Sequence, residues 1–493
     1  MSRIAFSTEP PSPVGRTVVV GAGPAGLLAT LRASTEAHEI LLVDHGKDFY
    51  GRRRPDARQY ADATTAVSGF GGAALLSCGR MRLTHRVGTT LSPRFPPHDI
   101  EDRQREIDTV LLQDESEKNI ELYGTDMVAA AALAARATEC DLDYTHYPVR
   151  ELDGEQLFSV MGSMRERIAG VGRILCGTRC MDVRPSPRSG SRWEVWLSGE
   201  GGEYPRLVHA DNVVLAPGAA ATAWLHDQGQ RLGLPSRPAT PEIGLHLEGP
   251  RDLLEPLLTA GPDPLLTWQS PDGATARCLN PWTGDGIVPA PGHQGAHRHV
   301  TRRTDRSSNR AQITLLVRCT GPQALTASQA RVLAFHGGVI AQTLGDFFQD
   351  RPTTGTTGAA AVGYLPSLPK ATTGSLSTLL PRPYREAMKA LIIRLAKLSP
   401  SLLHEENLLY GLAVQGIEHR FDITDSMQAP EHPGLYLVGD GPGLTDGIMA
   451  AAETGWIAGD AIAAQHRPMV DLGRLVPQAR NANQLSHDPI PAA

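Results

Sequence analysis

The sequence predicts an α/β protein whose parallel-sheet domain is built from both ends of the chain, with a mixed α/β region inserted between them. Three observations predict this fold. A β-branched run, a glycine turn, a helix pattern and a second apolar run occupy residues 17–46. A strand, glycine turn and long apolar helix pattern returns at residues 434–465. Residues 170–220 alternate apolar and polar side chains around a glycine-rich hairpin and end in a buried strand, Asn212 to Ala216.

The composition narrows the classes of protein. A chain of 493 residues with 41% hydrophobic and 20% charged residues is neither a coiled coil, nor collagen-like, nor wholly disordered. Its 50 glycines and 38 prolines predict many tight turns and close backbone approaches. The formal charge of -6 argues against binding of nucleic acid or of an anionic membrane surface.

Location and metal content follow from what the sequence lacks. No apolar run approaches the roughly 18 to 20 residues that span a bilayer, and the first residues lack the apolar core of a secretory signal. The six cysteines form neither a CxxC pair nor a paired zinc signature. We therefore expect a cytoplasmic protein with buried thiols, no membrane segment and no metal site.

Each residue of the first glycine turn has a separate task. Gly21 permits the tight turn, Gly23 lets a pyrophosphate approach the backbone, and Gly26 allows the helix to pack closely on the strand. Pro24 and Ala25 begin the helix, whose N-terminus is suited to hold phosphates. The turn therefore predicts a dinucleotide site.

Two acidic residues decide which dinucleotide is expected. Asp44 stands 18 residues past Gly26, at the end of the next strand, where a carboxylate can accept hydrogen bonds from an adenosine ribose. Gly439 and Asp440 follow the C-terminal strand, and Asp440 can bind a ribityl chain. Amides near Gly447 and Ile448, at the start of the last helix, can face the N1 and O2 edge of a flavin and favour its anionic reduced form. Because NAD has no ribityl chain, the cofactor predicted is FAD.

The buried strand at residues 213–218 completes a resemblance. Together with the two glycine turns it is similar to the Rossmann-type FAD-binding domain of many two-domain flavoprotein oxidoreductases. That resemblance implies that Ala216 and Gly218 lie beneath the cofactor. It also implies that the strand around Met181 borders the adenine.

A narrower resemblance covers most of residues 17–465. The segment at residues 43–90 looks like the part of a poorly characterised family of FAD-dependent dehydrogenases in which a glycine-rich turn leads into an FSDGKL-like sequence. The chain departs from that family at Cys78-Gly79-Arg80-Met81, where Asp-Gly-Lys-Leu is usual, and at His246, where arginine is common. Both departures leave the class of substrate open.

Further residues are expected at the cofactor and at the substrate. The resemblance implies that His45, Arg52, Gly71 and Gly72 border FAD, the two glycines letting the backbone pass close to the ring.

The catalytic candidates are His85, His246 and Arg80. The two histidines belong to segments expected near the flavin and could act as a base, although a histidine is more often a surface or satisfied core residue. Arg80 and Arg82 could orient an anionic substrate, or could equally be structural. Arg298 to Arg310 forms a basic loop that would suit an acidic substrate or a carrier-protein partner, or is simply solvated.

The predicted activity is hydride transfer between flavin N5 and a small organic substrate, by a dehydrogenase or oxidase. With no second GxGxxG unit, oxygen, a quinone or a transiently bound NAD(P)H would serve as the redox partner. One alternative is a monooxygenase that uses NAD(P)H and O2, but Asp211-Asn212 and Gly441-Pro442-Gly443 replace the turns usual in that class. The other is a non-redox FAD-containing binding module, in which the long lid-like insertion would have little use.

The expected division of the chain follows from these patterns. Helices are predicted at 127–138, 326–349 and 382–398, and strands at 243–248 and 311–319. The expected units are a flexible leader (1–15), the first part of the FAD domain (16–100), a mainly helical insertion (101–160), the meander with the buried strand of the FAD domain (161–224), a substrate or lid domain (225–404), the C-terminal part of the FAD domain (405–466) and a tail (467–493).

Overall fold

The fold was analysed in a computed structural model. It describes residues 15–35, 38–52, 67–76, 79–114, 120–199, 205–283, 286–287, 301–302, 309–337, 339–355, 363–368, 371–416 and 419–466. The predicted tail, nearly all of the predicted leader and most of the basic loop between Arg298 and Arg310 lie outside these residues. Among the described helices, none combines the length and the apolar character needed to cross a bilayer.

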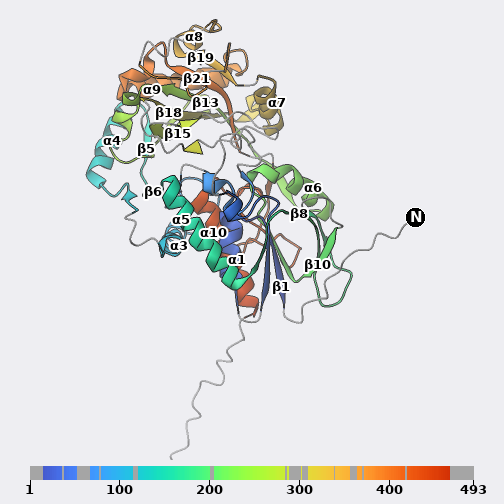
Figure 1. Ribbon diagram of the computed structural model, residues 1–493. Coiled ribbons are helices and arrows are strands. Elements are labelled where there is room, and N and C mark those ends of the chain that lie inside the picture. Colours follow the sequence, from blue (N-terminus) through green and yellow to red (C-terminus); the bar gives the residue numbers. More distant parts are fainter. Residues whose placement is uncertain are drawn as a thin grey trace, which may run out of the picture.

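The chain forms a mixed α/β fold of two bodies, one above the other in Figure 1. The lower body holds a five-stranded sheet in the order β23-β11-β1-β2-β7, and every neighbouring pair is parallel. Its strands are all short and mostly apolar: β1 (Arg16–Val20), β2 (Glu39–Val43), β7 (Arg173–Leu175), β11 (Asn212–Leu215) and β23 (Leu435–Leu437). This is the Rossmann-type arrangement predicted from the glycine turns.

Helices cover one face of the parallel sheet and an antiparallel meander covers the other (Figure 1). The helices are α1 (Pro24–Ala33), α5 (Gly154–Val171) and α10 (Ile448–His466). The meander is β8 (Thr178–Pro185), β9 (Trp193–Gly199) and β10 (Arg206–Ala210), in the order β10-β9-β8. The first and last segments of the described chain therefore lie side by side in one body.

Small residues let α1 and α10 pack at very short range. A Cβ built at Gly455 would lie 1.9 Å from the carbonyl oxygen of Ala25, and one at Gly459 would lie 2.8 Å from that of Ala29. The contact advances by four residues in both helices, so α1 and α10 run in the same direction. Both N-termini consequently point to the carboxyl edge of the sheet.

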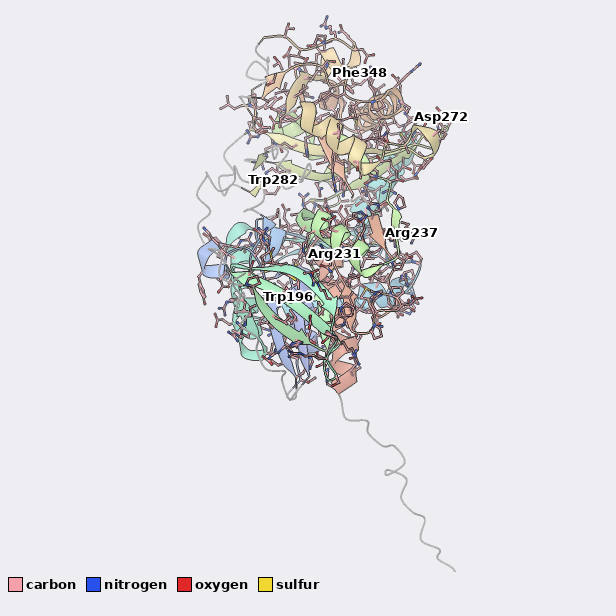
Figure 2. All side chains as sticks on the ribbon, turned by 90° about the vertical axis from the view of Figure 1, so that its right-hand side faces the viewer. Trp196, Arg231, Arg237, Asp272, Trp282 and Phe348 are labelled. Carbon is pink, nitrogen blue, oxygen red and sulfur yellow. The ribbon has the colours of Figure 1, made fainter. Side chains whose placement is uncertain are left out.

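The upper body is built on an eight-stranded sheet in the order β20-β19-β21-β13-β18-β15-β14-β5. Figure 2, turned by 90°, shows it with Phe348 and Asp272 above, while Trp196 lies in the lower body. The central strands β13 (Glu242–Gly249) and β18 (Ala311–Arg318) confirm the two strands predicted there, and β21 is Leu408–Gln415. Helix α9 (Arg382–Leu398), also as predicted, packs its apolar side on one face of this sheet.

The helix predicted at 326–349 is wrong, because a strand interrupts it. The structure has α7 (Ala327–Gly337), β19 (Ile340–Thr343) and α8 (Leu344–Phe348) in its place. Two glycines weaken the helix at 337–338, and β19 then pairs antiparallel with β21. Tertiary pairing therefore overrides the helical pattern there.

The remaining elements are divided between the two bodies. Residues 101–160 contribute to both, since α3 (Pro97–Leu112) packs on α10 whereas β5 (Asp143–Thr145) pairs with β14. The other helices and strands are β3 (Arg80–Arg82), β4 (Leu122–Tyr123), α4 (Met127–Glu139), β6 (Val149–Glu151), α6 (Thr222–Leu232), β12 (Ser236–Pro238), β14 (Leu265–Gln269), β15 (Thr275–Thr283), β16 (Gly286–Ile287), β17 (Thr301–Arg302), β20 (Thr372–Thr373) and β22 (His419–Phe421).

Candidate functional site

The first glycine turn requires glycine at two positions and leaves room at a third. Gly21 has φ +108°, and a Cβ there would lie 2.0 Å from the Ala216 carbonyl oxygen; at Gly26 it would lie 1.8 Å from the Gly21 carbonyl oxygen. At Gly23 the nearest described heavy atom would be 3.9 Å away, on Gly72. Gly23 is also the N-cap of α1 and makes no side-chain capping bond. A ligand group can therefore approach the backbone at Gly23.

Asp44 is nearly saturated by the chain itself. Its Oδ2 accepts a hydrogen bond from the amide of Ala22, and its Oδ1 accepts from those of Gly46 and Gly69, all at 2.8 Å. A carboxylate offers about four acceptor sites, so roughly one remains for a ribose hydroxyl. Asp44 therefore ties three loops together in addition to its predicted role. His45, beside it, is exposed, with its Nδ1 3.9 Å from Asp44 Oδ1.

The predicted glycine pair at 71 and 72 lies against the first glycine turn. The Gly71 amide donates to the carbonyl of Ala22 at 2.8 Å, and a Cβ at Gly72 would lie 2.9 Å from Gly23 Cα. Arg52 holds this segment, because its Nη1 donates to the carbonyls of Phe70 and Gly72 at 2.6 and 2.9 Å. Burial lowers the pKa of Arg52 to about 10, so its charge remains at neutral pH.

The C-terminal turn lies beside the N-terminal one. The Val438 amide donates to the carbonyl of Leu215 at 3.0 Å, which extends the parallel pairing by one residue. A Cβ at Gly439 would lie 3.1 Å from that of Ala25, at the start of α1. Asp440 accepts a hydrogen bond from the Thr445 hydroxyl at 2.6 Å. The two turns, far apart in the sequence, thus meet at one edge of the sheet.

Open space also adjoins two further predicted positions. At Gly447 and Gly218, with φ of +131° and +68°, no heavy atom of the described chain lies within 4 Å of a built Cβ. Gly447 directly precedes Ile448, the first residue of α10. Ala216 donates its amide to the Val20 carbonyl at 2.8 Å, which places it beside β1. The loops that follow β11 and precede α10 therefore leave room for a ligand at Gly218 and Gly447.

Met181 lies farther along the meander. It stands at a register shift of β8 and is half exposed, and its carbonyl accepts a hydrogen bond from the Trp224 indole at 3.5 Å. β8 begins directly above Asp44, because the Thr178 amide donates to the Asp44 carbonyl at 2.9 Å. This strand therefore starts at the expected adenosine end of the site.

The two helix N-termini are offset along their common direction. Gly455 is seven residues into α10, whereas its contact residue Ala25 is one residue into α1. A difference of six residues at 1.5 Å each puts the start of α10 about 9 Å beyond the start of α1. The partial positive charges of the two N-termini are therefore offset from each other along the common helix direction.

One face of the eight-stranded sheet is unusually polar and is turned towards the lower body. Cross-strand pairs align Glu248 with Gln312, His246 with both Thr314 and Tyr410, and Glu242 with Gln415. We call these seven residues the polar face. Gln415 hydrogen-bonds Asp446, two residues before the start of α10, so the polar face reaches the second helix N-terminus.

The two candidate histidines have different surroundings. His246 is buried in the polar face, with Nδ1 3.1 Å from the Thr314 hydroxyl. His85 lies on the loop after β3, with Nδ1 2.7 Å from Glu101 Oε1 on α3. His246 shares the polar face with Gln415, which hydrogen-bonds Asp446. The loop that carries His85 reaches the same residue through Gly88, whose carbonyl accepts a hydrogen bond from the Asp446 amide at 2.8 Å.

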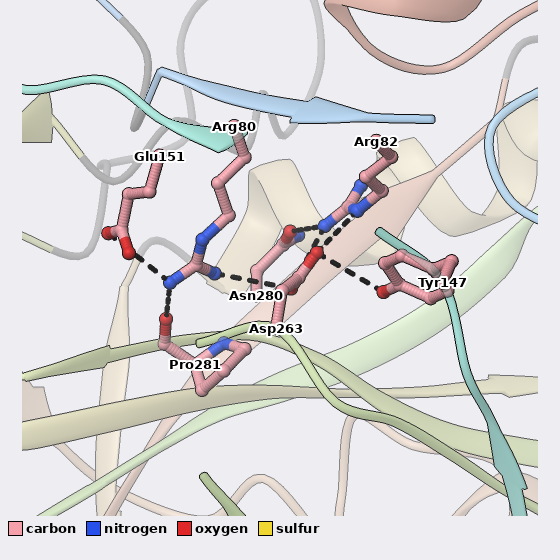
Figure 3. Close-up of polar contacts among 7 residues, drawn as sticks. All are labelled: Arg80, Arg82, Tyr147, Glu151, Asp263, Asn280 and Pro281. Carbon is pink, nitrogen blue, oxygen red and sulfur yellow. Dashed lines mark hydrogen bonds and ion pairs between the residues drawn. The ribbon is translucent and has the colours of Figure 1, made fainter. Parts of the chain in front are cut away.

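Arg80 and Arg82 are internal ion-pair partners rather than open anion sites (Figure 3). Arg82 Nε donates to Asp263 Oδ2 at 2.6 Å, and Arg80 Nη1 to Asp263 Oδ1 at 3.3 Å. The Tyr147 hydroxyl donates to the same carboxylate at 3.2 Å, and Glu151 lies 3.7 Å from Arg80. The side chain of Asp263 is completely buried. This arrangement favours the structural interpretation of both arginines.

The charge balance of this cluster explains how a carboxylate is tolerated there. Burial alone would raise the pKa of Asp263, but Arg82 and Arg80 outweigh it and hold that pKa below its usual value. The cluster joins β3 and β6 of the lower side to β14 and β15 of the upper sheet. It therefore fastens the two bodies to each other.

Sequence reasoning missed Asp263, Glu248 and Gln415. Each stands beside or within an otherwise apolar strand, and only the register of the upper sheet reveals its neighbours. Burial raises the pKa of Glu248, although the amide of Ser367 and the charge of Arg310 oppose this shift. No local motif signals such residues.

Comparison with known proteins adds little. No family model matches the sequence, and no curated protein does. Glycine oxidase from Geobacillus kaustophilus is similar in structure at 14% identity, over 93% of this chain and 98% of that one, with a TM-score of 0.39. Pyridoxine 4-oxidase from Mesorbium loti matches at 14% identity over 92% and 100%, with a TM-score of 0.42. The p-nitrophenol 4-monooxygenase PnpA from Pseudomonas putida DLL-E4 matches at 12% over 93% and 80%, at 0.40. Likenesses this distant decide nothing about the function of this chain.

Proposed function

We propose that the protein is an FAD-dependent oxidoreductase, a dehydrogenase or oxidase that acts on a small organic molecule. The observation that carries the proposal is the pair of parallel helices α1 and α10. Their N-termini lie at one sheet edge, about 9 Å apart along the helix direction. FAD carries a pyrophosphate and, farther along the molecule, an electron-rich pyrimidine edge. Each of these groups is stabilised by a helix N-terminus, the pyrophosphate by that of α1 and the pyrimidine edge by that of α10.

The residues present fit such a group. Gly23 and Gly447 leave space where a Cβ would stand. Asp440 lies on the turn that leads from β23 to α10. Gly23 and Pro24 would receive the pyrophosphate, Asp440 the ribityl chain, and Gly447 with Ile448 the pyrimidine edge. When bound, FAD would supply the capacity to take up or give back a hydride at N5.

The polar face would hold the substrate. His246 is its one histidine, the side chain that most often serves as a general acid or base, and the Thr314 hydroxyl, 3.1 Å from its Nδ1, fixes the orientation of its ring. His246 would accept or hold a proton as the substrate is oxidised. Tyr410, whose hydroxyl hydrogen-bonds Glu248, would support the polar face from within the sheet. Redox partners proposed for turnover are O2, a quinone or NAD(P)H.

The test begins with the purified protein. A flavin absorbance band that persists through gel filtration, and is weakened in Asp440→Ala, is the expected result. A protein that takes up no FAD would overturn the proposal. Anaerobic bleaching by candidate substrates without NADPH would support the dehydrogenase or oxidase activity, whereas bleaching by NADPH gated by substrate would indicate a monooxygenase.

A further inference from the structure

We propose that Gln415 is a positioning residue of the flavin site, whose side-chain oxygen accepts a hydrogen bond from the N3–H of the flavin ring. This inference rests on the proposed function. Gln415 is the last residue of β21 and is 95% buried, as its exposed fraction of 5% shows. Its Nε2 donates to the carboxylate of Asp446, the residue before Gly447.

The other atom of this amide has a different status. Within the described part of the chain, the buried Oε1 of Gln415 has no hydrogen-bond partner. An unsatisfied buried acceptor is unfavourable, so a bound donor at this point would remove a penalty. The Asp446 contact fixes which amide atom faces the carboxylate, because a second oxygen there would be repelled. The acceptor is therefore held ready beside the start of α10.

The chemistry of the flavin edge matches this pattern. The pyrimidine edge presents an acceptor at O2, a donor at N3 and an acceptor at O4. Because backbone N–H groups only donate, the amides of Gly447 and Ile448 can hydrogen-bond an acceptor of the ring but cannot accept a hydrogen bond from N3–H. A glutamine oxygen next to those amides supplies the missing acceptor. Gln415 would thereby distinguish the correct orientation of the ring from the flipped one.

The experiment compares FAD with 3-methyl-FAD, in which a methyl group replaces the N3 hydrogen. Apo-protein is prepared from the holoprotein, and the dissociation constants of both flavins are measured by fluorescence for the unaltered chain and for Gln415→Leu. We expect the unaltered chain to bind FAD about tenfold or more tightly than 3-methyl-FAD. In Gln415→Leu this preference should fall to about threefold or less.

The control is Gln342→Leu, which removes a buried glutamine of β19 outside the polar face, whose Nε2 donates to the carbonyl of Arg351. It should keep the tenfold preference. Because the readout is a ratio within each variant, a general loss of affinity or stability cancels. Equal binding of both flavins by the unaltered chain, or an unchanged preference in Gln415→Leu, would overturn this inference alone. Failure to bind either flavin would instead overturn the proposed function.

Discussion

Gly455 lies directly on the backbone of Ala25, so closely that a Cβ at residue 455 would stand 1.9 Å from the Ala25 carbonyl oxygen. Gly459 repeats the contact one turn later, on Ala29. Because both helices are rigid, this contact sets how far α10 projects beyond α1. The spacing of the two helix N-termini, and with it the length of ligand that the edge accepts, depends on these small residues.

Adding a single methyl group should therefore disturb both stability and ligand binding. Gly455→Ala is expected to lower the free energy of unfolding by about 2–3 kcal/mol, since backbone atoms on α1 cannot yield as a flexible side chain would. FAD affinity should fall as well. Urea unfolding and flavin fluorescence measure the two effects. The matched control is Gly170→Ala on α5, where no described atom lies within 4 Å of the built Cβ; it should be neutral or stabilising by up to ~1 kcal/mol. Equal losses in both variants would contradict the argument.

Asp44 is expected to matter even without a ligand. Asp44→Ala leaves the amides of Ala22, Gly46 and Gly69 without their shared acceptor, and should cost the apo-protein about 3 kcal/mol of unfolding free energy. Asp44→Asn keeps one acceptor oxygen and should lose less than half of that. The comparison requires flavin-free protein and chemical denaturation. If both apo-proteins matched the unaltered chain in stability, the role of Asp44 in tying the loops would be wrong.

The sequence predicted the lower body well because its signals are local. The glycine turns at Gly21 and Gly439 follow apolar strands, and each glycine has a steric reason visible at short range. It predicted the upper body less well. The neighbours of Gln415 and Asp263 come from strands far away in the chain, and β19 is a strand only because β21 offers it a partner.

The roles of individual residues were also predictable only where their contacts are local in the sequence. Arg80 was identified from its place in a segment, but its contacts depend on Asp263 and Pro281, about two hundred positions later. A local sequence pattern does not identify contacts between residues so far apart in the chain. The placement of His246 on a buried sheet face was likewise outside the reach of the sequence, although its strand was predicted.

His38 should make the lower body sensitive to mild acid. Burial, with the neighbouring His466, lowers the pKa of His38 to about 4, although Asp211 and Glu39 oppose this shift. A histidine whose pKa is lower in the folded than in the unfolded state takes up its proton mainly on unfolding. Stability is then full above about pH 6.5 and declines as the pH falls towards 4.

The measurement compares urea unfolding at pH 7.5 and pH 5.0 for the unaltered chain and for His38→Gln. Glutamine can still hydrogen-bond the Thr17 hydroxyl, which lies 2.6 Å from His38 Nε2, but it does not titrate. The unaltered chain should lose about 1–2 kcal/mol more than the variant between these two pH values, after allowance for solvent screening. A parallel decline of both proteins would show that other groups cause the acid sensitivity.

Asp263 provides the test of whether Arg80 and Arg82 are structural. Asp263→Asn leaves one buried and one partly buried guanidinium group, those of Arg80 and Arg82, without their shared charge, so we expect a loss of about 3–5 kcal/mol in unfolding free energy. Because the pKa of Asp263 is held below its usual value, its stabilisation is present above about pH 4 and is lost as the pH falls further. The gap between the unaltered chain and Asp263→Asn should therefore narrow from pH 5 to pH 3.

An anion-binding role for Arg80 makes the opposite prediction for ligands. If the arginine were poised to receive an anionic substrate, removing the Asp263 charge would strengthen binding of small anions at little cost in stability. The structural role predicts a less stable protein with its flavin absorbance retained. Asp102→Asn is the matched control, since Asp102 pairs with Arg105 at 2.7 Å with both side chains more than half exposed, and exposed pairs contribute at most ~1 kcal/mol. If the loss of unfolding free energy were as small as in the control and anions bound more tightly, the interpretation of Arg80 as a substrate-binding residue would be supported instead.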